Sequence, residues 1–235
     1  MVSVFVNPAQ FNDKKDLLKY RRDGKADLIK AEKAGTDLVF LPAEAEMYPP
    51  GFQTWIEAGG LSGALCGPFR PGHFRGAATV VAKLVNLVEP SRAYLGLKDY
   101  QQLKIVERMV RDLGLKVRIV ACPTVREADG LAMSSRNRRL SPPERRRAAS
   151  LFRSLQSAAD LIESKKLTKR AALLEHFKRG LDLGGKDRVE YVQAVHPETL
   201  RNQSSRIGPP VLLAAALWIG RTRLIDNIKV GDLHG

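Results

Sequence analysis

Residues 92–122, RAYLGLKDYQQLKIVERMVRDLGLKVRIVAC, contain the pattern that decides the fold. Residues 93–95 form a short apolar run typical of a strand, and residues 117–122, directly before Pro123, predict a second one. Between them, residues 101–113 carry apolar side chains at helical spacing. A strand, a helix and a further strand within about 30 residues predict a parallel β-α-β unit.

The same alternation occurs upstream of this unit. Residues 2–6 predict an opening strand, and residues 13–34 are charged with spaced leucines, as in a helix. Residues 37–41 predict a buried strand, and residues 77–88 a second helix. The first half of the chain is therefore expected to be α/β, with a doubly wound parallel sheet.

The pattern changes near residue 125. Ser141 is followed by Pro142 at the first helical position and by Glu144 three residues after the serine, which is a strong helix start. The remaining predictions are a helix over 169–180 and strands over 188–195, 211–218 and 223–226. We expect two domains, residues 1–124 and residues 125–235, the second being a small α+β unit.

Charge and composition limit the class of protein. The chain has 235 residues and a net charge of +14, which suits phosphates or polyanions as partners. The basic residues are scattered and no aromatic residues alternate with them, so a single anion site is favoured over nucleic-acid binding. The longest apolar stretch, residues 211–220, is shorter than the ~20 residues of a membrane span, and no export signal is present. We expect a cytoplasmic protein that does not enter a membrane.

Polar groups follow two of the predicted strands. Gln10 comes after the opening strand, at the sheet edge where ligands bind in such folds, although it could equally face water. After the strand at 93–95, Gly96 permits close backbone approach and Lys98 supplies a positive charge. Asp99 could accept a hydrogen bond from a helix amide or from a ribose. A nucleotide site and an ordinary helix start remain open at this position.

Two loops complete the candidate chemistry. Ser134, Ser135 and Arg136 can surround a phosphate chain, with Arg136 opposing charge on a departing pyrophosphate, or can form an ordinary serine-rich loop. His73 lies between two arginines in FRPGHFRG, residues 69–76, where it could stabilise a turn or take part in catalysis.

Four motifs together resemble one family. FVNPAQF (5–11), RPGHFRG (70–76), GLKDYQQL (96–103) and READGLAMSSRN (126–137) occur in this order in pantothenate synthetases, the pantoate:beta-alanine ligases. The resemblance runs from about residue 2 to RLIDN at 223–227. It implies a Rossmann-like domain of the nucleotidyltransferase type, a smaller C-terminal domain that closes over ATP, and usually a homodimer.

The resemblance also implies the reaction and its residues. ATP and pantoate form pantoyl adenylate and pyrophosphate with Mg²⁺ present, and the amine of beta-alanine then attacks the activated carbonyl. Lys98 and Arg136 are the expected catalytic residues, because adenylation needs alignment and positive charge near the leaving pyrophosphate. No metal cluster is predicted, so Mg²⁺ would arrive with the ATP phosphates. The expected contacts are pantoate with Gln10 and Gln102, beta-alanine with Gln10, and ATP with Gly96, Leu97, Lys98, Asp99, Val125, Met133, Ser134, Ser135 and Arg136.

The sequence also departs from the family pattern. The family has an earlier strand and a Pro-Thr-Met-Gly loop leading to a His-x-Gly-His motif, which do not occur in the printed sequence. Leu97 and Cys66 stand where the family usually has glutamate. We therefore expect a ligase chain that lacks its N-terminal segment, with a central strand missing and adenylation slowed severely, on the order of 10²-fold or more. The alternative is a catalytically impaired or diverged nucleotide-binding relative without turnover.

Overall fold

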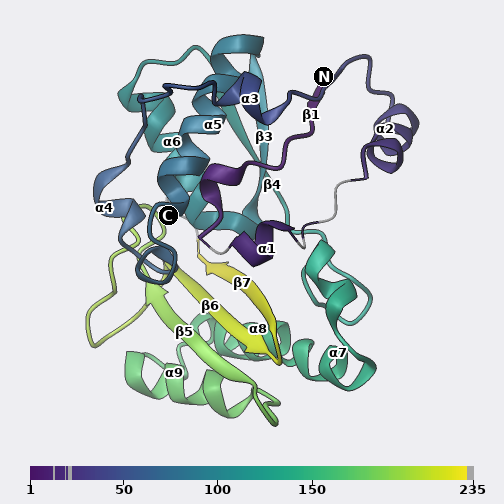
Figure 1. The fold of residues 1–235 in the computed structure, drawn as a ribbon. Coiled ribbons are helices and arrows are strands. Elements are labelled where there is room, and N and C mark those ends of the chain that lie inside the picture. Colours follow the sequence, from purple (N-terminus) through teal and green to yellow (C-terminus); the bar gives the residue numbers. More distant parts are fainter. Residues whose placement is uncertain (13, 19, 21–22, 232–235) are drawn as a thin grey trace.

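The computed structural model describes residues 1–12, 14–18, 20 and 23–231 (Figure 1). Helices surround two pairs of parallel strands in the N-terminal half, and a three-stranded antiparallel sheet with its own helices lies at the opposite end (Figure 1). This arrangement confirms the predicted α/β fold with an α+β C-terminal part.

The parallel strands form two separate pairs. β1 (Val2–Ser3) pairs with β2 (Val39–Phe40), and β3 (Arg92–Gly96) pairs with β4 (Arg118–Cys122). Within the described part of the chain the two pairs are not hydrogen-bonded to each other.

Two long helices build the N-terminal core. α5 (His73–Val88) and α6 (Tyr100–Asp112) pack on each other and on β3 and β4 (Figure 1). α5 begins four residues before the predicted start at 77, because Gly72 has a φ of 77° and turns the chain directly into the helix. The buried residues of this core are Cys66, Phe74, Ala78, Ala82, Ile105, Val106 and Met109.

The predicted helix over 13–34 is divided in the structure. It comprises α1 (Lys14–Leu18) and α2 (Gly24–Lys33), and residues 13, 19, 21 and 22 lie outside the described part. Two four-residue helices that the sequence did not predict, α3 (Glu44–Met47) and α4 (Gly59–Ser62), lie in the connection to α5.

The C-terminal sheet agrees closely with the prediction. β5 (Arg188–Val195), β6 (Val211–Ile219) and β7 (Thr222–Val230) form an antiparallel sheet in this order. β7 is four residues longer than predicted at its C-terminal end, because it pairs with β6 along its whole length.

Three helices pack with this sheet. They are α7 (Pro142–Ala148), α8 (Ser150–Glu163) and α9 (Arg170–Arg179). The predicted helix start is confirmed, since the Ser141 backbone N–H donates to the Glu144 carboxylate at 2.8 Å. The fully buried core residues include Leu151, Leu155, Leu173, Ala215 and Leu217.

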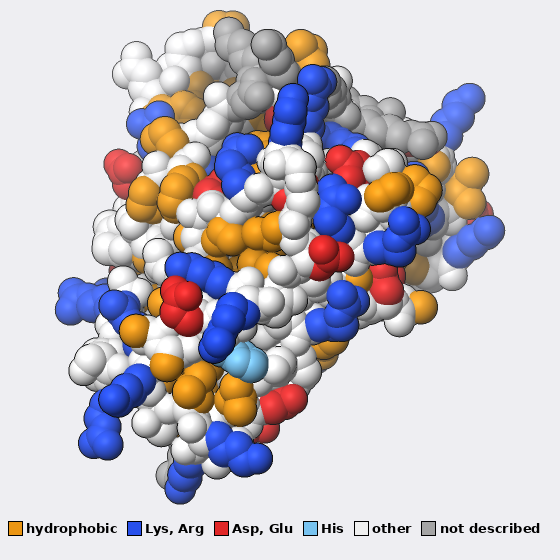
Figure 2. Space-filling model, turned by 90° about the horizontal axis from the view of Figure 1, so that it is seen from below, with side chains coloured by type: hydrophobic (Ala, Val, Ile, Leu, Met, Phe, Trp, Pro, Cys, Tyr) orange, Lys and Arg blue, Asp and Glu red, His pale blue; other side chains and the backbone are white. Residues whose placement is uncertain are grey.

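The surface agrees with the scattered charge of the sequence. On the face seen from below in Figure 2, lysine and arginine side chains are spread among acidic and uncharged ones and do not form a continuous stripe. Among the described residues, no helix combines the length and apolar character needed to cross a membrane.

Candidate active site

A cavity of about 270 Å³ brings together most of the predicted site residues. It lies between η1 (Pro8–Gln10), η3 (Leu97–Asp99) with the start of α6, η4 (Ser135–Arg139) and β7. The predicted residues in its lining are Gln10, Lys98, Asp99, Gln102, Ser134, Ser135 and Arg136. Sequence positions more than 100 residues apart therefore share one pocket.

Four predicted residues do not line this cavity, namely Gly96, Leu97, Val125 and Met133. Two of these four, Met133 and Val125, are linked to the cavity by hydrogen bonds of their backbone groups. The Lys98 ammonium donates to the Met133 carbonyl at 2.8 Å, and the Met133 N–H donates to the Val125 carbonyl at 2.9 Å. The described structure thus gives Met133 and Val125 a supporting position beside the pocket.

Hydrogen bonds of Asn7 hold the turn that carries Gln10 in place. The Asn7 side-chain amide donates to the Gly76 carbonyl at 3.0 Å and to Gln10 Oε1 at 3.3 Å. Tyr48 donates its hydroxyl proton to Asn7 Oδ1 at 2.8 Å. Burial raises the pKa of Tyr48 to about 12, so its hydroxyl remains a donor at neutral pH. Asn7 is buried and its orientation is fixed at both ends.

The two neighbouring glutamines at the start of α6 have different surroundings. Gln102 lines the cavity. The buried Gln101 points away from it, accepts from the Cys66 N–H at 3.2 Å and donates to the carbonyls of Leu61 and Ala64. Of the pair, Gln102 is therefore the one that faces the cavity.

Lys98 and Asp99 enter the cavity from the turn before α6. Burial lowers the pKa of Lys98 from the ordinary lysine value. Asp99 occupies the position before the first helical residue, but its side chain makes no capping hydrogen bond, which corrects one of the two roles considered for it. Its exposed carboxylate is thus free of the helix backbone.

Arg136 faces the cavity from η4 and is oriented by Asp16 of α1. The Asp16 carboxylate accepts from Arg136 at 2.7 Å and from Arg139 at 3.0 Å. Burial alone would raise the pKa of Asp16, but the hydrogen bonds and charges of the two arginines outweigh burial and hold that pKa below its usual value. The loop that carries Ser134 and Ser135 is thereby fastened to the N-terminal half.

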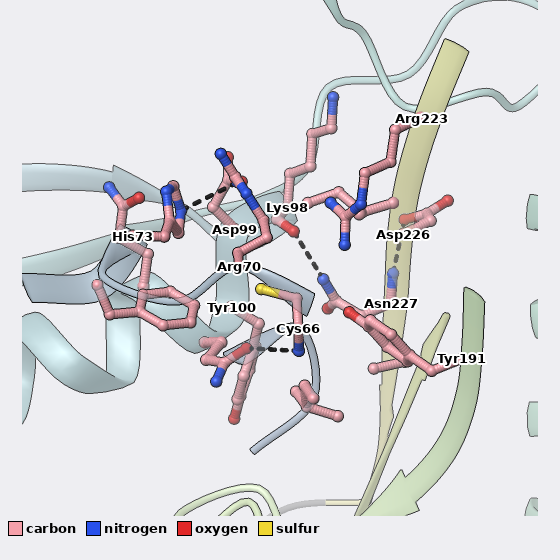
Figure 3. Close-up of a pocket in the computed structure, with 16 residues that line it drawn as sticks. Cys66, Arg70, His73, Lys98, Asp99, Tyr100, Tyr191, Arg223, Asp226 and Asn227 are labelled. Atoms are coloured by element: carbon pink, nitrogen blue, oxygen red, sulfur yellow. Dashed lines mark hydrogen bonds between the residues drawn. The ribbon is translucent and has the colours of Figure 1, made fainter. Parts of the chain in front are cut away.

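Further charged residues of the lining were not among the predicted site residues. Arg70 and Arg223 line this cavity and also a neighbouring pocket, which Figure 3 shows. Arg223 is paired with Glu190 at 2.5 Å, and Trp218 also donates to that carboxylate, at 2.7 Å. Both arginines occur in motifs that carry the family resemblance, RPGHFRG and RLIDN, which was the available signal.

Positive charge dominates the cavity. The lining holds four cationic side chains and one carboxylate, Asp99. Such a lining suits ligands that carry several negative charges, such as a nucleotide triphosphate together with carboxylate substrates. The two glutamines add uncharged donors and acceptors beside the cations.

The fold is of the α/β nucleotidyltransferase type, and the cationic pocket suits an enzyme that binds a nucleotide. The chain belongs to the pantoate-beta-alanine ligase family, whose sequence profile matches residues 1–229. It is 47% identical over 228 residues to the pantothenate synthetase of Moorella thermoacetica, covering 97% of this chain and 80% of the relative. It is 49% identical to that of Oleidesulfovibrio alaskensis, covering 98% and 82% respectively.

Solved structures agree with this assignment. The pantothenate synthetase of Thermus thermophilus superposes with a TM-score of 0.92 at 45% identity, covering 98% of this chain and 83% of that one. The pantoate-beta-alanine ligase of Francisella tularensis, solved in complex with beta-gamma ATP and beta-alanine, has a TM-score of 0.75 at 30% identity and covers 97% and 78%. The comparisons give no support for the alternative of a binding module without turnover.

Proposed function

We propose that this chain condenses pantoate with beta-alanine in an ATP-dependent reaction, through a pantoyl adenylate. The observation that carries the proposal is the convergence of Lys98, Arg136, Gln10 and Gln102 on one cavity, in a chain of the pantoate-beta-alanine ligase family. The ATP and beta-alanine complex of the Francisella relative supports ATP and beta-alanine as ligands.

In the first half-reaction a pantoate carboxylate oxygen bonds to the α-phosphorus of ATP, and the bond to pyrophosphate breaks. Gln10 and Gln102 would hold pantoate through hydrogen bonds. Lys98 and Arg136 would neutralise the charge that grows on the departing pyrophosphate, and Asp99 would accept from the ribose. The protein mainly supplies alignment and charge, since it forms no covalent bond with the substrates in this scheme.

Mg²⁺ is proposed as the accompanying ion, carried mainly by the ATP phosphates. Among the described residues no three histidine, cysteine or acidic side chains are grouped as metal ligands. The one carboxylate of the cavity lining, Asp99, fits an ion that keeps most of its phosphate and water ligands. When bound, Mg²⁺ neutralises phosphate charge in addition to the lysine and arginine.

In the second half-reaction the amine of beta-alanine attacks the activated carbonyl. A C–N bond forms, the bond from the carbonyl carbon to the AMP oxygen breaks, AMP leaves with the electron pair, and the amine loses a proton. Gln10, whose backbone carbonyl accepts from Arg70 at 3.4 Å, would help to place the amine.

We further propose that the enzyme acts as a cytoplasmic homodimer and that its two domains divide at residues 124 and 125. The family resemblance supports the dimer, and the separation of the parallel pairs from the β5-β6-β7 sheet supports the division. Sedimentation of the purified chain would test the oligomeric state.

Pantoate-dependent exchange of pyrophosphate into ATP tests the function without beta-alanine. We expect Lys98→Met to slow this exchange by about 10²- to 10³-fold relative to the unchanged chain, as when one donor to transition-state charge is removed. Lys116→Met, which removes an exposed lysine outside the cavity, is the matched control and should exchange at the unchanged rate. Exchange that proceeds equally without pantoate, or at full rate in Lys98→Met, would contradict the proposal.

A further inference from the structure

Arg70 is the arginine of this cavity that lacks a carboxylate partner among the described residues. Its guanidinium contacts His73 Nε2 at 3.1 Å and the Gln10 backbone carbonyl at 3.4 Å, and no acidic side chain of the described residues pairs with it. Burial, followed by the nearby charge of Arg223, lowers the pKa of Arg70 from its ordinary value. A half-buried guanidinium held only by neutral groups is stabilised when an anion binds to it.

The other arginines of the cavity are already paired. Arg136 binds Asp16 at 2.7 Å, and Arg223 binds Glu190 at 2.5 Å. Arg70 shares the cavity with both of them, so a second cation close by adds to its attraction for an anion. Arg70 is therefore the guanidinium of this lining with the most unused capacity to bind a carboxylate.

His73 fixes the position of Arg70 relative to Gln10. Its Nδ1 lies 2.7 Å from the Gln10 carbonyl oxygen, which can only accept, so Nδ1 carries the proton. Nε2 then accepts from Arg70 at 3.1 Å. Burial lowers the pKa of His73 to about 4, so the ring is neutral at pH 7 and can serve both contacts. The edge-on contact with Phe74 holds the ring plane.

The chemistry of the reaction selects the anion. The pantoate carboxylate is consumed when it bonds to phosphorus, and Lys98 and Arg136 are assigned to the phosphates. The carboxylate of beta-alanine takes no part in bond making and remains charged throughout. It needs a fixed cation close to Gln10, and Arg70 lies there.

We propose that Arg70 binds the carboxylate of the amine substrate and that His73 is the positioning residue that orients Arg70 against the Gln10 turn. This assignment deepens the proposed function and rests on it. It gives the enzyme a preference for amines that carry a carboxylate.

The test compares beta-alanine with propylamine, which lacks the carboxylate, as acceptors of the pantoyl group. We expect Arg70→Met to reduce the preference for beta-alanine over propylamine, measured as the ratio of their kcat/KM values, by about 10- to 100-fold. Arg70→Lys should retain part of the preference, because the lysine ammonium keeps the positive charge but lacks the planar set of donors of the guanidinium. A ratio of this kind is unaffected by the fraction of protein that is correctly folded.

Variants of His73 test the positioning role. His73→Phe keeps a ring but removes both nitrogens, and it should lower the preference for beta-alanine. His73→Gln can still donate to the Gln10 carbonyl and accept from Arg70, so it should retain more of that preference. Arg75→Met, on the outer face of the same helix where its guanidinium lies over Trp55, is the control and should keep the full preference.

Three results would overturn the assignment. The first is an unchanged preference for beta-alanine in Arg70→Met. The second is a rise in the KM of Arg70→Met for ATP or pantoate in place of a rise in its KM for beta-alanine. The third is an equal preference for beta-alanine in His73→Phe and His73→Gln. Absence of pantoate-dependent exchange in the unchanged chain is a different result, because it would overturn the proposed function itself and the assignment with it.

Discussion

At the scale of single residues, identical side chains do different work in this protein. Gln101 and Gln102 are neighbours at the start of α6, yet one is buried under the loop before α5 and the other lines the cavity. The helix separates them because successive residues point about 100° apart around its axis. Substitution of Gln101 should therefore affect stability, and substitution of Gln102 should affect substrate binding.

We expect Gln102→Ala to lower kcat/KM for pantoate by about tenfold or more, through loss of a substrate hydrogen bond, with little change in melting temperature. Gln101→Ala should instead lower the free energy of unfolding by about 1–3 kcal/mol, because it leaves the Cys66 N–H and two carbonyls without their partner. Steady-state kinetics and thermal denaturation of both variants check this. The reverse assignment of effects would show that the glutamines are misplaced.

At the scale of secondary-structure elements, one glycine sets the position of the Gln10 turn. η1 lies directly on the first turns of α5, and a Cβ at Gly76 would be 2.3 Å from the Ala9 carbonyl oxygen. The absence of a side chain therefore allows the backbone of Ala9 and Gln10 to approach the helix. Asn7 completes the contact by donating to the Gly76 carbonyl.

Gly76→Ala is expected to push η1 away from α5, because its neighbours are backbone atoms that cannot rotate aside. The free energy of unfolding should fall by about 1–3 kcal/mol and the KM for pantoate should rise, since Gln10 moves with the turn. Gly60→Ala in α4, where a Cβ would meet nothing within 4 Å, provides the control and should not destabilise the protein. Chemical denaturation and pantoate titration of both variants provide the measurement.

At the scale of the whole molecule, a few polar contacts join segments that are distant in sequence. Arg126 and Asp226 form a pair at 2.6 Å, and Asn227 donates to the backbone carbonyls of Leu97 and Lys98. β7 is thereby fastened to the turn that carries Lys98. In the C-terminal half, the buried Asp187 accepts from Arg147 at 2.6 Å and from the Gly220 N–H at 2.7 Å.

Asp187 makes the stability of the fold depend on pH in the acidic range. Burial alone would raise the pKa of Asp187, but its hydrogen bonds to Arg147 and to two backbone N–H groups outweigh burial and lower that pKa in the folded state. Its contribution to stability is therefore present above the unfolded value of about 3.9 and is lost as the pH falls through the lower folded value.

Asp187→Asn should accordingly lower the free energy of unfolding by about 1–3 kcal/mol at pH 7, and the difference from the unchanged chain should shrink towards pH 3. Urea denaturation at several pH values measures it. The exposed neighbour Asp182→Asn makes the same change in charge and serves as the control. A difference that grows as the pH falls would contradict this account.

Local sequence predicted the elements well where periodicity was strong. β5 and β6 were predicted at nearly their observed bounds, and the helix start at Ser141 was predicted from its capping residues. The division of the 13–34 region into α1 and α2 was not predicted, and neither was the early start of α5. The first depends on the connection between the two helices, and the second on the left-handed conformation of Gly72. The capping role considered for Asp99 was wrong, since its side chain makes no hydrogen bond to the helix.

The sequence by itself determined the α/β class, the family resemblance and the motifs that hold Gln10, Lys98 and Arg136, because periodicity and motif order are properties of the residue order alone. Only the tertiary structure decided which motif residues share one cavity and which lie beside it. It also showed that Arg70 has no acidic partner among the described residues, while Arg136 and Arg223 have one. Pairing and burial depend on neighbours brought together by folding, so no spacing in the sequence reports them.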